Sequence, residues 1–153
     1  MSVKERSAVK KHTGDTAYAE TLLNTLKAFK NGDFGVRMRV NQSGIDREIA
    51  ATLNEIIEQN ERLTKDLVRL SKVVGKEGRT TARASIGNVT GSWSICVESV
   101  NSLIGDLVRP TAEVTRVIGA VAKGDLSQSI PLETEGPVKG EFLRTARLVN
   151  TDG

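Results

Sequence analysis

Apolar side chains recur with a helical period along most of the chain. From Ile49 to Val74 they step by alternating intervals of four and three residues, which is the period of a coiled-coil seam. The seam comprises Ile49, Leu53, Ile56, Asn60, Leu63, Leu67, Leu70 and Val74. No glycine or proline interrupts residues 45–74, so we predict a single helix that starts near Asp46 and continues to Val74.

A shorter apolar stripe precedes this seam, at Leu22, Leu26 and Phe29. We expect its helix to start near Asp15, whose side chain can cap free backbone N–H groups, after a polar lead-in over residues 1–14. The lead-in carries a basic cluster that includes His12, the only histidine of the chain, and is interpreted as a solvated tail.

A third periodic run extends from Trp93 to Val121 and contains Pro110. Proline lacks a backbone N–H and crowds the preceding turn, so we expect a kink or a restart near Arg109-Pro110. A last helix is expected to begin near Gly140 and to be cut short after Asn150.

The segment from Phe34 to Val40 alternates apolar and polar residues, as a strand does. It has no long partner run, so we interpret it as an extended connector whose inward side chains pack on helices. Those side chains are Phe34, Val36, Met38 and Val40. The segment from Leu126 to Leu132 alternates in the same way, with Leu126 and Ile130 expected to pack inward.

Three glycines, Gly32, Gly78 and Gly124, recur at intervals of 46 residues, each at the end of a predicted helix. A glycine can adopt the left-handed conformation that ends a helix. Asparagines follow 22, 23 and 26 residues later, at Asn54, Asn101 and Asn150. Such a repeat predicts three similar units, over residues 15–65, 66–112 and 113–153, the last of them truncated.

Composition supports an all-α fold. Hydrophobic residues make up 38% of the 153 residues and aromatic residues only 3%, so the core must consist of Leu, Ile, Val and Ala, which suits thin helical packing. The net charge is +3, with basic and acidic residues interleaved, which disfavours a basic helical nucleic-acid binder. No apolar run is long enough to span a membrane, and we expect a cytoplasmic protein.

No pattern in the sequence indicates catalysis or a cofactor. A phosphate-binding glycine loop and a metal-ligand cluster are both missing from the sequence, so no catalytic, cofactor-binding or metal-binding residue is assigned. Cys96 is the single cysteine and lies in an apolar helical setting, so it is expected to be a buried structural thiol in a reducing compartment.

The order of helix, Gly-Asp, alternating connector and a second helix with an apolar-Asn pair resembles the HAMP domain, the signal-relay module of sensor histidine kinases and chemoreceptors. The match is clearest from Val121 to Ser127 and extends over about residues 16–150. The segments from Val73 to Gly78 and from Gly91 to Trp93 resemble tandem arrays in hybrid histidine kinases. Unit two departs from the pattern, with Gly78-Arg79 in place of Gly-Asp and an extra residue, Glu77.

The resemblance implies a parallel homodimer that forms a four-helix coiled coil, with helices continuous between units. It also implies a non-enzymatic relay between the input and kinase segments of a two-component parent. The expected structural and relay residues are Gly32, Asp33, Phe34, Val36, Met38, Leu53, Asn54, Leu67, Leu70, Val74, Gly78, Asn101, Pro110, Gly124, Asp125 and Asn150.

Two alternatives stay open at this point. The asparagines either fix helix register as polar seam positions or bond to the connector backbone. The whole array is either a relay or a static coiled-coil scaffold that switches nothing.

Overall fold

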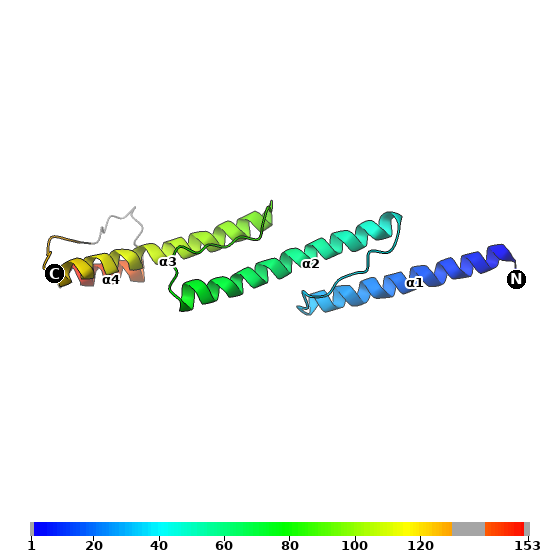
Figure 1. Cartoon of the computed structure of the whole chain (residues 1–153), viewed down its shortest axis with the longest axis horizontal. Coiled ribbons are helices and arrows are strands. Elements are labelled where there is room, and N and C mark those ends of the chain that lie inside the picture. The colour runs from blue at the N-terminus through cyan, green and yellow to red at the C-terminus, as the bar shows by residue number, and fades with distance from the viewer. Residues whose placement is uncertain (1, 130–139, 152–153) are drawn as a thin grey trace. The chain divides into compact units, whose positions relative to one another are not determined.

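The structure of the chain is a computed structural model that describes residues 2–129 and 140–151, with the backbone alone for residues 7–13. Within these ranges the chain is all-α and has no strand, which confirms the predicted fold class (Figure 1). The helices are α1 (Val3–Lys30), α2 (Gly44–Leu70), the π-helix η1 (Ser71–Lys76), α3 (Ser92–Ala122) and α4 (Glu141–Thr151).

The start of α1 differs from the prediction. The helix begins at Val3 rather than near Asp15, so the expected polar lead-in is helical. A capping box starts it: the Glu5 backbone N–H donates to Ser2 Oγ (3.3 Å) and the Ser2 N–H donates to the Glu5 carboxylate. Gly14 therefore lies inside a helix, where it costs about 1 kcal/mol relative to alanine. The side chain of His12 lies outside the described residues.

The long central helix is confirmed, because α2 and η1 follow one another without a break from Gly44 to Lys76. Its last six residues are π-helical, which the periodicity did not indicate. A restart at Pro110 is wrong: α3 passes through this residue, whose ring is fully buried. The isolated alternating segment around Phe34 is an extended connector and not a strand, as predicted.

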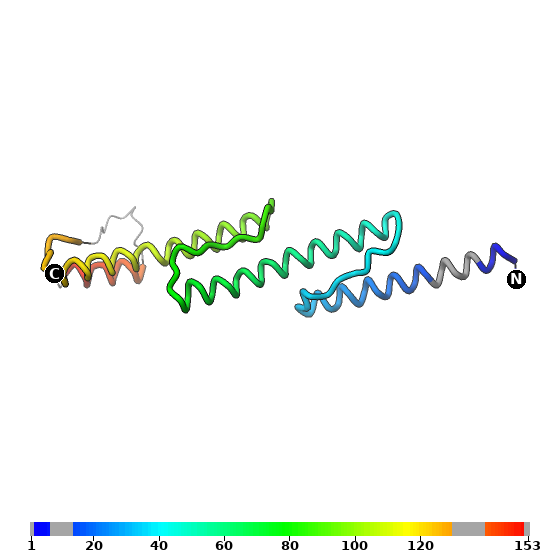
Figure 2. The backbone as a smooth tube through the Cα atoms, in the orientation of Figure 1, coloured from blue at the N-terminus to red at the C-terminus, as the bar shows by residue number. Residues whose placement is uncertain are grey.

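The chain divides into two compact parts, Met1–Val68 and Arg69–Gly153. In the first part, α1 and α2 are joined by a connector over residues 31–43 that returns from the end of α1 to the start of α2 (Figure 2). Its core consists of Met38, Ala50, Leu53 and Ile57, with Tyr18, Leu22, Phe29 and Val36 packed against it. The connector thus supplies one of the four buried core side chains.

The second part contains two groups of buried side chains. Leu70, Ala84 and Ile86 are each 5% exposed. Further along the chain, α3 contacts α4, and Val117 and Ala146 are buried between half-buried apolar neighbours on both helices. Small residues such as Ala84 and Ala146 are among the buried side chains, which fits the low aromatic content of the chain.

Candidate functional site

The first and third connectors leave their helices by the same turn. Gly32 and Gly124 have φ angles of +89° and +87°, so the predicted left-handed glycines are confirmed. The Gly32 N–H donates to Phe29 O (2.9 Å), and the Asp33 N–H donates to Ala28 O (3.0 Å). Gly124 and Asp125 repeat both bonds at the same distances, which makes both turns Schellman motifs.

The aspartate after each of these glycines fixes the start of the connector. Asp33 Oδ1 accepts the Gly35 N–H at 3.0 Å, and Asp125 Oδ1 accepts the Ser127 N–H at 3.0 Å. Asp125 also accepts the Ser127 hydroxyl (2.6 Å) and the Gln128 amide (3.1 Å). The hydrogen bonds from Ser127, its hydroxyl first, hold the pKa of Asp125 below the ordinary aspartate value.

Unit two begins its connector differently. Gly78 also has a left-handed φ, +68°, but the residue after it is Arg79, which has no carboxylate to accept a backbone N–H. The Arg79 N–H donates to Val73 O (2.9 Å), six residues back, whereas Asp33 reaches five residues back. The turn is therefore one residue wider than the other two.

Two of the three predicted asparagines, Asn54 and Asn101, clamp the connector backbone. The Met38 N–H donates to Asn54 Oδ1 (2.7 Å), and Asn54 Nδ2 donates to Met38 O (2.9 Å). Asn101 holds Ala84 by the same pair of bonds, at 2.6 and 3.1 Å. Each amide satisfies both polar groups of one extended residue, as a neighbouring strand would. Of the two interpretations left open by the sequence, the bond to the connector is the one that holds here.

The clamped residue has a fixed place in each connector, six residues after the glycine that ends the first helix. This rule gives Met38 after Gly32 and Ala84 after Gly78. In unit three it points to Ile130, which lies outside the described residues. Asn150 is half-buried and has an interaction of its own, so its clamp stays a prediction.

An arginine precedes the clamped residue in units one and two. Arg37 Nη1 donates to the carbonyl oxygens of Phe34 (2.8 Å) and Val36 (2.7 Å). Arg83 Nη1 donates to those of Thr80 and Ala82, both at 2.8 Å. These bonds hold the connector extended at corresponding positions, and sequence reasoning missed them because both arginines fall on the polar side of the alternation.

Arg37 also links its connector to α2 through Glu61. Its guanidinium and the Lys65 ammonium both contact the Glu61 carboxylate. Hydrogen bonds from Lys65 and then Arg37 lower the pKa of Glu61. All three side chains are partly exposed, so the ion pairs contribute little stability.

The first helix of each unit also contacts the connector. Arg69 Nη2 donates to Arg83 O (2.7 Å), and Arg116 Nη2 donates to Ser129 O (3.1 Å). In unit one the contact is a hydroxyl, with Thr25 Oγ1 donating to Met38 Sδ at 3.1 Å. In each unit the first helix therefore bonds either to the clamped residue itself, as at Met38, or to the residue just before the clamped or predicted position, as at Arg83 and Ser129.

Several apolar predictions are confirmed. Met38 is 3% exposed, Leu53 9% and Leu70 5%, and Val74 is half-buried. Phe34 and Val36 are half-buried, and the Phe34 ring lies 5.4 Å from that of Phe29.

Other apolar side chains do not pack as expected. Val40 is 38% exposed and Leu126 64%. Leu67, a seam position, is 41% exposed. Cys96 is exposed rather than buried, because it falls outside the half-buried stripe of Trp93 and Val97 on α3.

A second set of glycines was missed by the sequence analysis. Gly44, Gly91 and Gly140 have φ angles of +61°, +60° and +60° and stand where each second helix starts. Each lies ten residues before its asparagine, so the stretch from the second glycine to the asparagine has one length in all three units. That constant spacing was the available signal, because the variable gaps reside entirely in the connectors.

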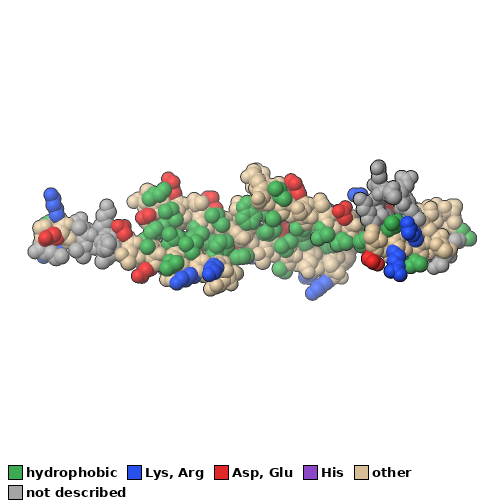
Figure 3. Space-filling model, turned by 180° about the vertical axis from the view of Figure 1, so that it is seen from behind, with side chains coloured by type: hydrophobic (Ala, Val, Ile, Leu, Met, Phe, Trp, Pro, Cys, Tyr) green, Lys and Arg blue, Asp and Glu red, His purple; other side chains and the backbone are tan. Residues whose placement is uncertain are grey.

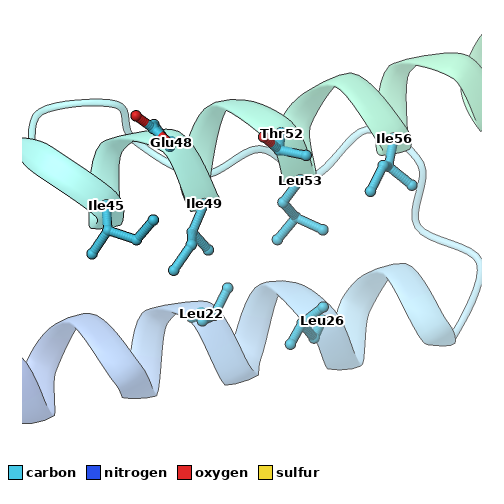
Figure 4. Close-up of a pocket in the computed structure, with 8 residues that line it drawn as sticks. All are labelled: Leu22, Leu26, Ile45, Glu48, Ile49, Thr52, Leu53 and Ile56. Carbon is cyan, nitrogen blue, oxygen red and sulfur yellow. The ribbon is translucent and has the colours of Figure 1, made fainter.

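An apolar groove runs between α1 and α2 (Figure 4). It has a volume of about 440 Å³ and is lined by Leu22, Leu26, Ile45, Glu48, Ile49, Thr52, Leu53 and Ile56. Figure 3 shows hydrophobic side chains gathered over this region of the surface. Leu26, Ile49 and Ile56 keep 42%, 39% and 41% of their surface exposed. The face is therefore apolar and uncovered within one copy of the chain.

Comparison with known proteins identifies one family. The HAMP domain family model matches residues 88–150, which include α3, the third connector and α4. This segment is a HAMP domain, a signal-relay module of sensor proteins. No solved structure matches the chain. Across the described residues, no helix combines the length and apolar character needed to cross a bilayer.

Proposed function

We propose, on the basis of the HAMP domain at residues 88–150, that the chain is a tandem array of three HAMP-like units that relays conformational change through a parallel homodimer. The proposed units are residues 15–65, 66–112 and 113–153. One observation carries this proposal. Asn54 and Met38 both lie outside the family match, and they make the same two bonds as Asn101, inside the match, makes to Ala84, which precedes it.

The apolar groove of unit one supports a dimer. Ile49, Ile56 and Leu67 belong to the heptad seam but stay about 40% exposed in the single chain, while Leu53 and Leu70 are buried. Covering the exposed positions would contribute roughly 25 cal/mol for each Å² of apolar surface removed from water. A second copy in parallel orientation places identical seam positions opposite one another, as a coiled coil requires.

The clamps give the relay a mechanical basis. Because Asn54 holds both backbone groups of Met38, a displacement of the connector moves α2 with it. The helix that carries this asparagine continues without a break into the next unit, so a change of packing in one unit biases the next. The parent protein is proposed to be a cytoplasmic hybrid sensor histidine kinase, on the resemblance of the array, with catalysis performed by segments other than this chain.

Cysteine crosslinking tests the dimer. In a Cys96→Ser background, Ile49→Cys and Leu67→Cys should each form disulfides between identical residues of two copies. Glu55→Cys, on the same helix but off the seam, is the matched control and should crosslink much more slowly. Sedimentation should give a dimer. A monomer at all accessible concentrations, or equal crosslinking at all three positions, would refute the proposal.

A second measurement separates a relay from a static scaffold, the alternative function. Asn54→Ala releases the connector of unit one, so a relay predicts an altered crosslinking rate at Leu67→Cys, beyond the clamp in sequence. A scaffold predicts an unchanged rate there. A nucleic-acid-binding function is less favoured because acidic and basic residues are interleaved along the chain.

A further inference from the structure

Unit two contains one residue more than its neighbours in the last turns of its first helix. Among the described side chains, each first helix has a buried residue shortly before its glycine: Thr25 (5% exposed), Leu70 (5%) and Val117 (1%). Thr25 and Val117 precede their glycines by seven residues, and Leu70 precedes Gly78 by eight. The extra residue therefore lies between Leu70 and Gly78.

The π-helix occupies this same interval, at Ser71–Lys76. A π-turn contains one residue more per hydrogen bond than an α-turn, and single π-turns in proteins accommodate such a residue without breaking the helix. The hydrogen bonds show the widening directly: the Glu77 N–H donates to Lys72 O, five residues back. The wider Arg79 to Val73 bond follows from the same extra residue.

The π-turn preserves a contact upstream of it. Arg69 donates to the carbonyl of the fifth residue after Gly78, and Arg116 donates to that of the fifth residue after Gly124. Arg69 stands nine residues before its glycine and Arg116 eight, so the two contacts are equivalent only because the extra residue has been absorbed. In a plain α-helix one additional residue would rotate Arg69 by about 100° and turn it away from the connector.

We propose that Arg69 is a positioning residue that links the first helix of unit two to its connector, and that the π-turn Ser71–Lys76 absorbs one inserted residue to keep Arg69 in place. Arg69 bonds Arg83, and the next residue, Ala84, is clamped by Asn101. Movement of the first helix is thus passed to α3 through two adjacent connector residues within one chain. The proposal rests on the three-unit organisation proposed above and does not require the dimer.

Single-residue deletions in the full chain test the role of the π-turn. Deleting Glu77 restores the seven-residue spacing of the other units, so we expect a purely α-helical end and a melting temperature within about 2 °C of the parent. Lys123 is the corresponding residue of unit three, which has no extra residue between Val117 and Gly124. Deleting Lys123 should therefore lower the melting temperature by about 5 °C or more. Equal losses for both deletions would overturn the proposal.

Amide hydrogen exchange tests Arg69 itself. Arg69→Gln should accelerate exchange of the Ala84 amide by about tenfold, because loss of the neighbouring bond loosens the clamped segment. Arg69→Lys, which keeps the charge and one donor, should restore part of the protection. Arg62→Gln, on the same helix and paired only with Glu58 among the described contacts, should leave it unchanged.

Two outcomes separate this proposal from the relay. A monomeric chain in which Arg69→Gln still accelerates exchange of the Ala84 amide would refute the dimeric relay and support the present proposal. A crosslinked dimer in which Arg69→Gln leaves the Ala84 amide unchanged would overturn the present proposal and leave the relay intact.

Discussion

The first two connectors are held to their second helices in the same way but leave their first helices differently. Asn54 and Asn101 make the same pair of bonds to the residue six positions after the glycine. The first helix of unit one ends in a Schellman turn with an aspartate, whereas that of unit two ends in a π-turn with an arginine. The bonds to the second helix are thus the repeated part of the unit, and the end of the first helix is the part that varies.

The largest expected effect on stability comes from the side chain of the clamped residue, which differs between the two connectors. Met38 is 3% exposed and fills the core of unit one, whereas Ala84 fills the equivalent place with a methyl group. Met38→Ala should cost about 3 kcal/mol of unfolding free energy, because it leaves a cavity. Urea denaturation at fixed protein concentration measures this loss. Val40→Ala, a truncation in the exposed part of the same connector, is the control and should cost well under half as much.

The clamps themselves should be energetically equal. Asn54→Ala and Asn101→Ala each leave a partly buried N–H and C=O without their partners, which should cost about 2 kcal/mol in each unit. Thr64→Ala is the control, because the Thr64 side chain is exposed and off the seam and its described bond is to Asn60 O of its own helix, so we expect a change within about 0.5 kcal/mol. A clear inequality between Asn54 and Asn101 in the same denaturation assay would break the comparison.

The glycines that end the first helices should respond alike although their turns differ. Gly32→Ala and Gly78→Ala place a Cβ at φ angles of +89° and +68°, where the left-handed conformation costs about 1 kcal/mol. Apart from the adjacent residues, no described atom lies within 4 Å of the added Cβ at either position, so the expected loss comes from the backbone conformation alone. Thermal unfolding should show similar decreases for both variants, and Gly119→Ala, in the interior of α3, should instead show an increase.

The smallest effect concerns pH and separates the two types of turn. The pKa of Asp125 is lowered in the folded chain, so its hydrogen bonds contribute stability above the ordinary aspartate value of about 3.8. That contribution is lost as pH falls through the lower folded value. Asp125→Asn should therefore reduce the amount of unfolding free energy that is lost as the pH is lowered. Arg79 occupies the equivalent place in unit two, so Arg79→Gln should leave the loss of unfolding free energy at low pH unchanged. An NMR titration of the Asp125 carboxyl would verify the direction of the shift.

Periodicity and turn chemistry predicted much of this architecture. The continuous helix after Gly44 followed from an uninterrupted 3.5-residue period, and the left-handed glycines followed from their place between a helix and an alternating segment. The start of α1 was not predicted although Ser2 and Glu5 form a recognisable capping box, because Asp15 is a second possible cap after a polar segment.

The connections between elements were harder to predict. A side chain that bonds a distant backbone leaves no periodic trace, so Arg37, Arg69 and Arg83 looked like solvated charges. For the asparagines, a seam role and a connector bond fit the sequence equally well, and only the geometry around Met38 and Ala84 decided between them. The π-turn was present in the sequence only as the extra residue at Glu77, with no indication of how the helix would absorb it.

The constant distance from the second glycine to the asparagine has a practical consequence. Ten residues separate Gly44 from Asn54, Gly91 from Asn101 and Gly140 from Asn150, while the stretch before each second glycine differs in length among the copies. Because the three connectors differ in length in this stretch, we expect residues 41–43 to accept an epitope, a spin label or a small reporter peptide. A probe introduced at this place would report on the neighbouring clamp while leaving the bonds that define it undisturbed.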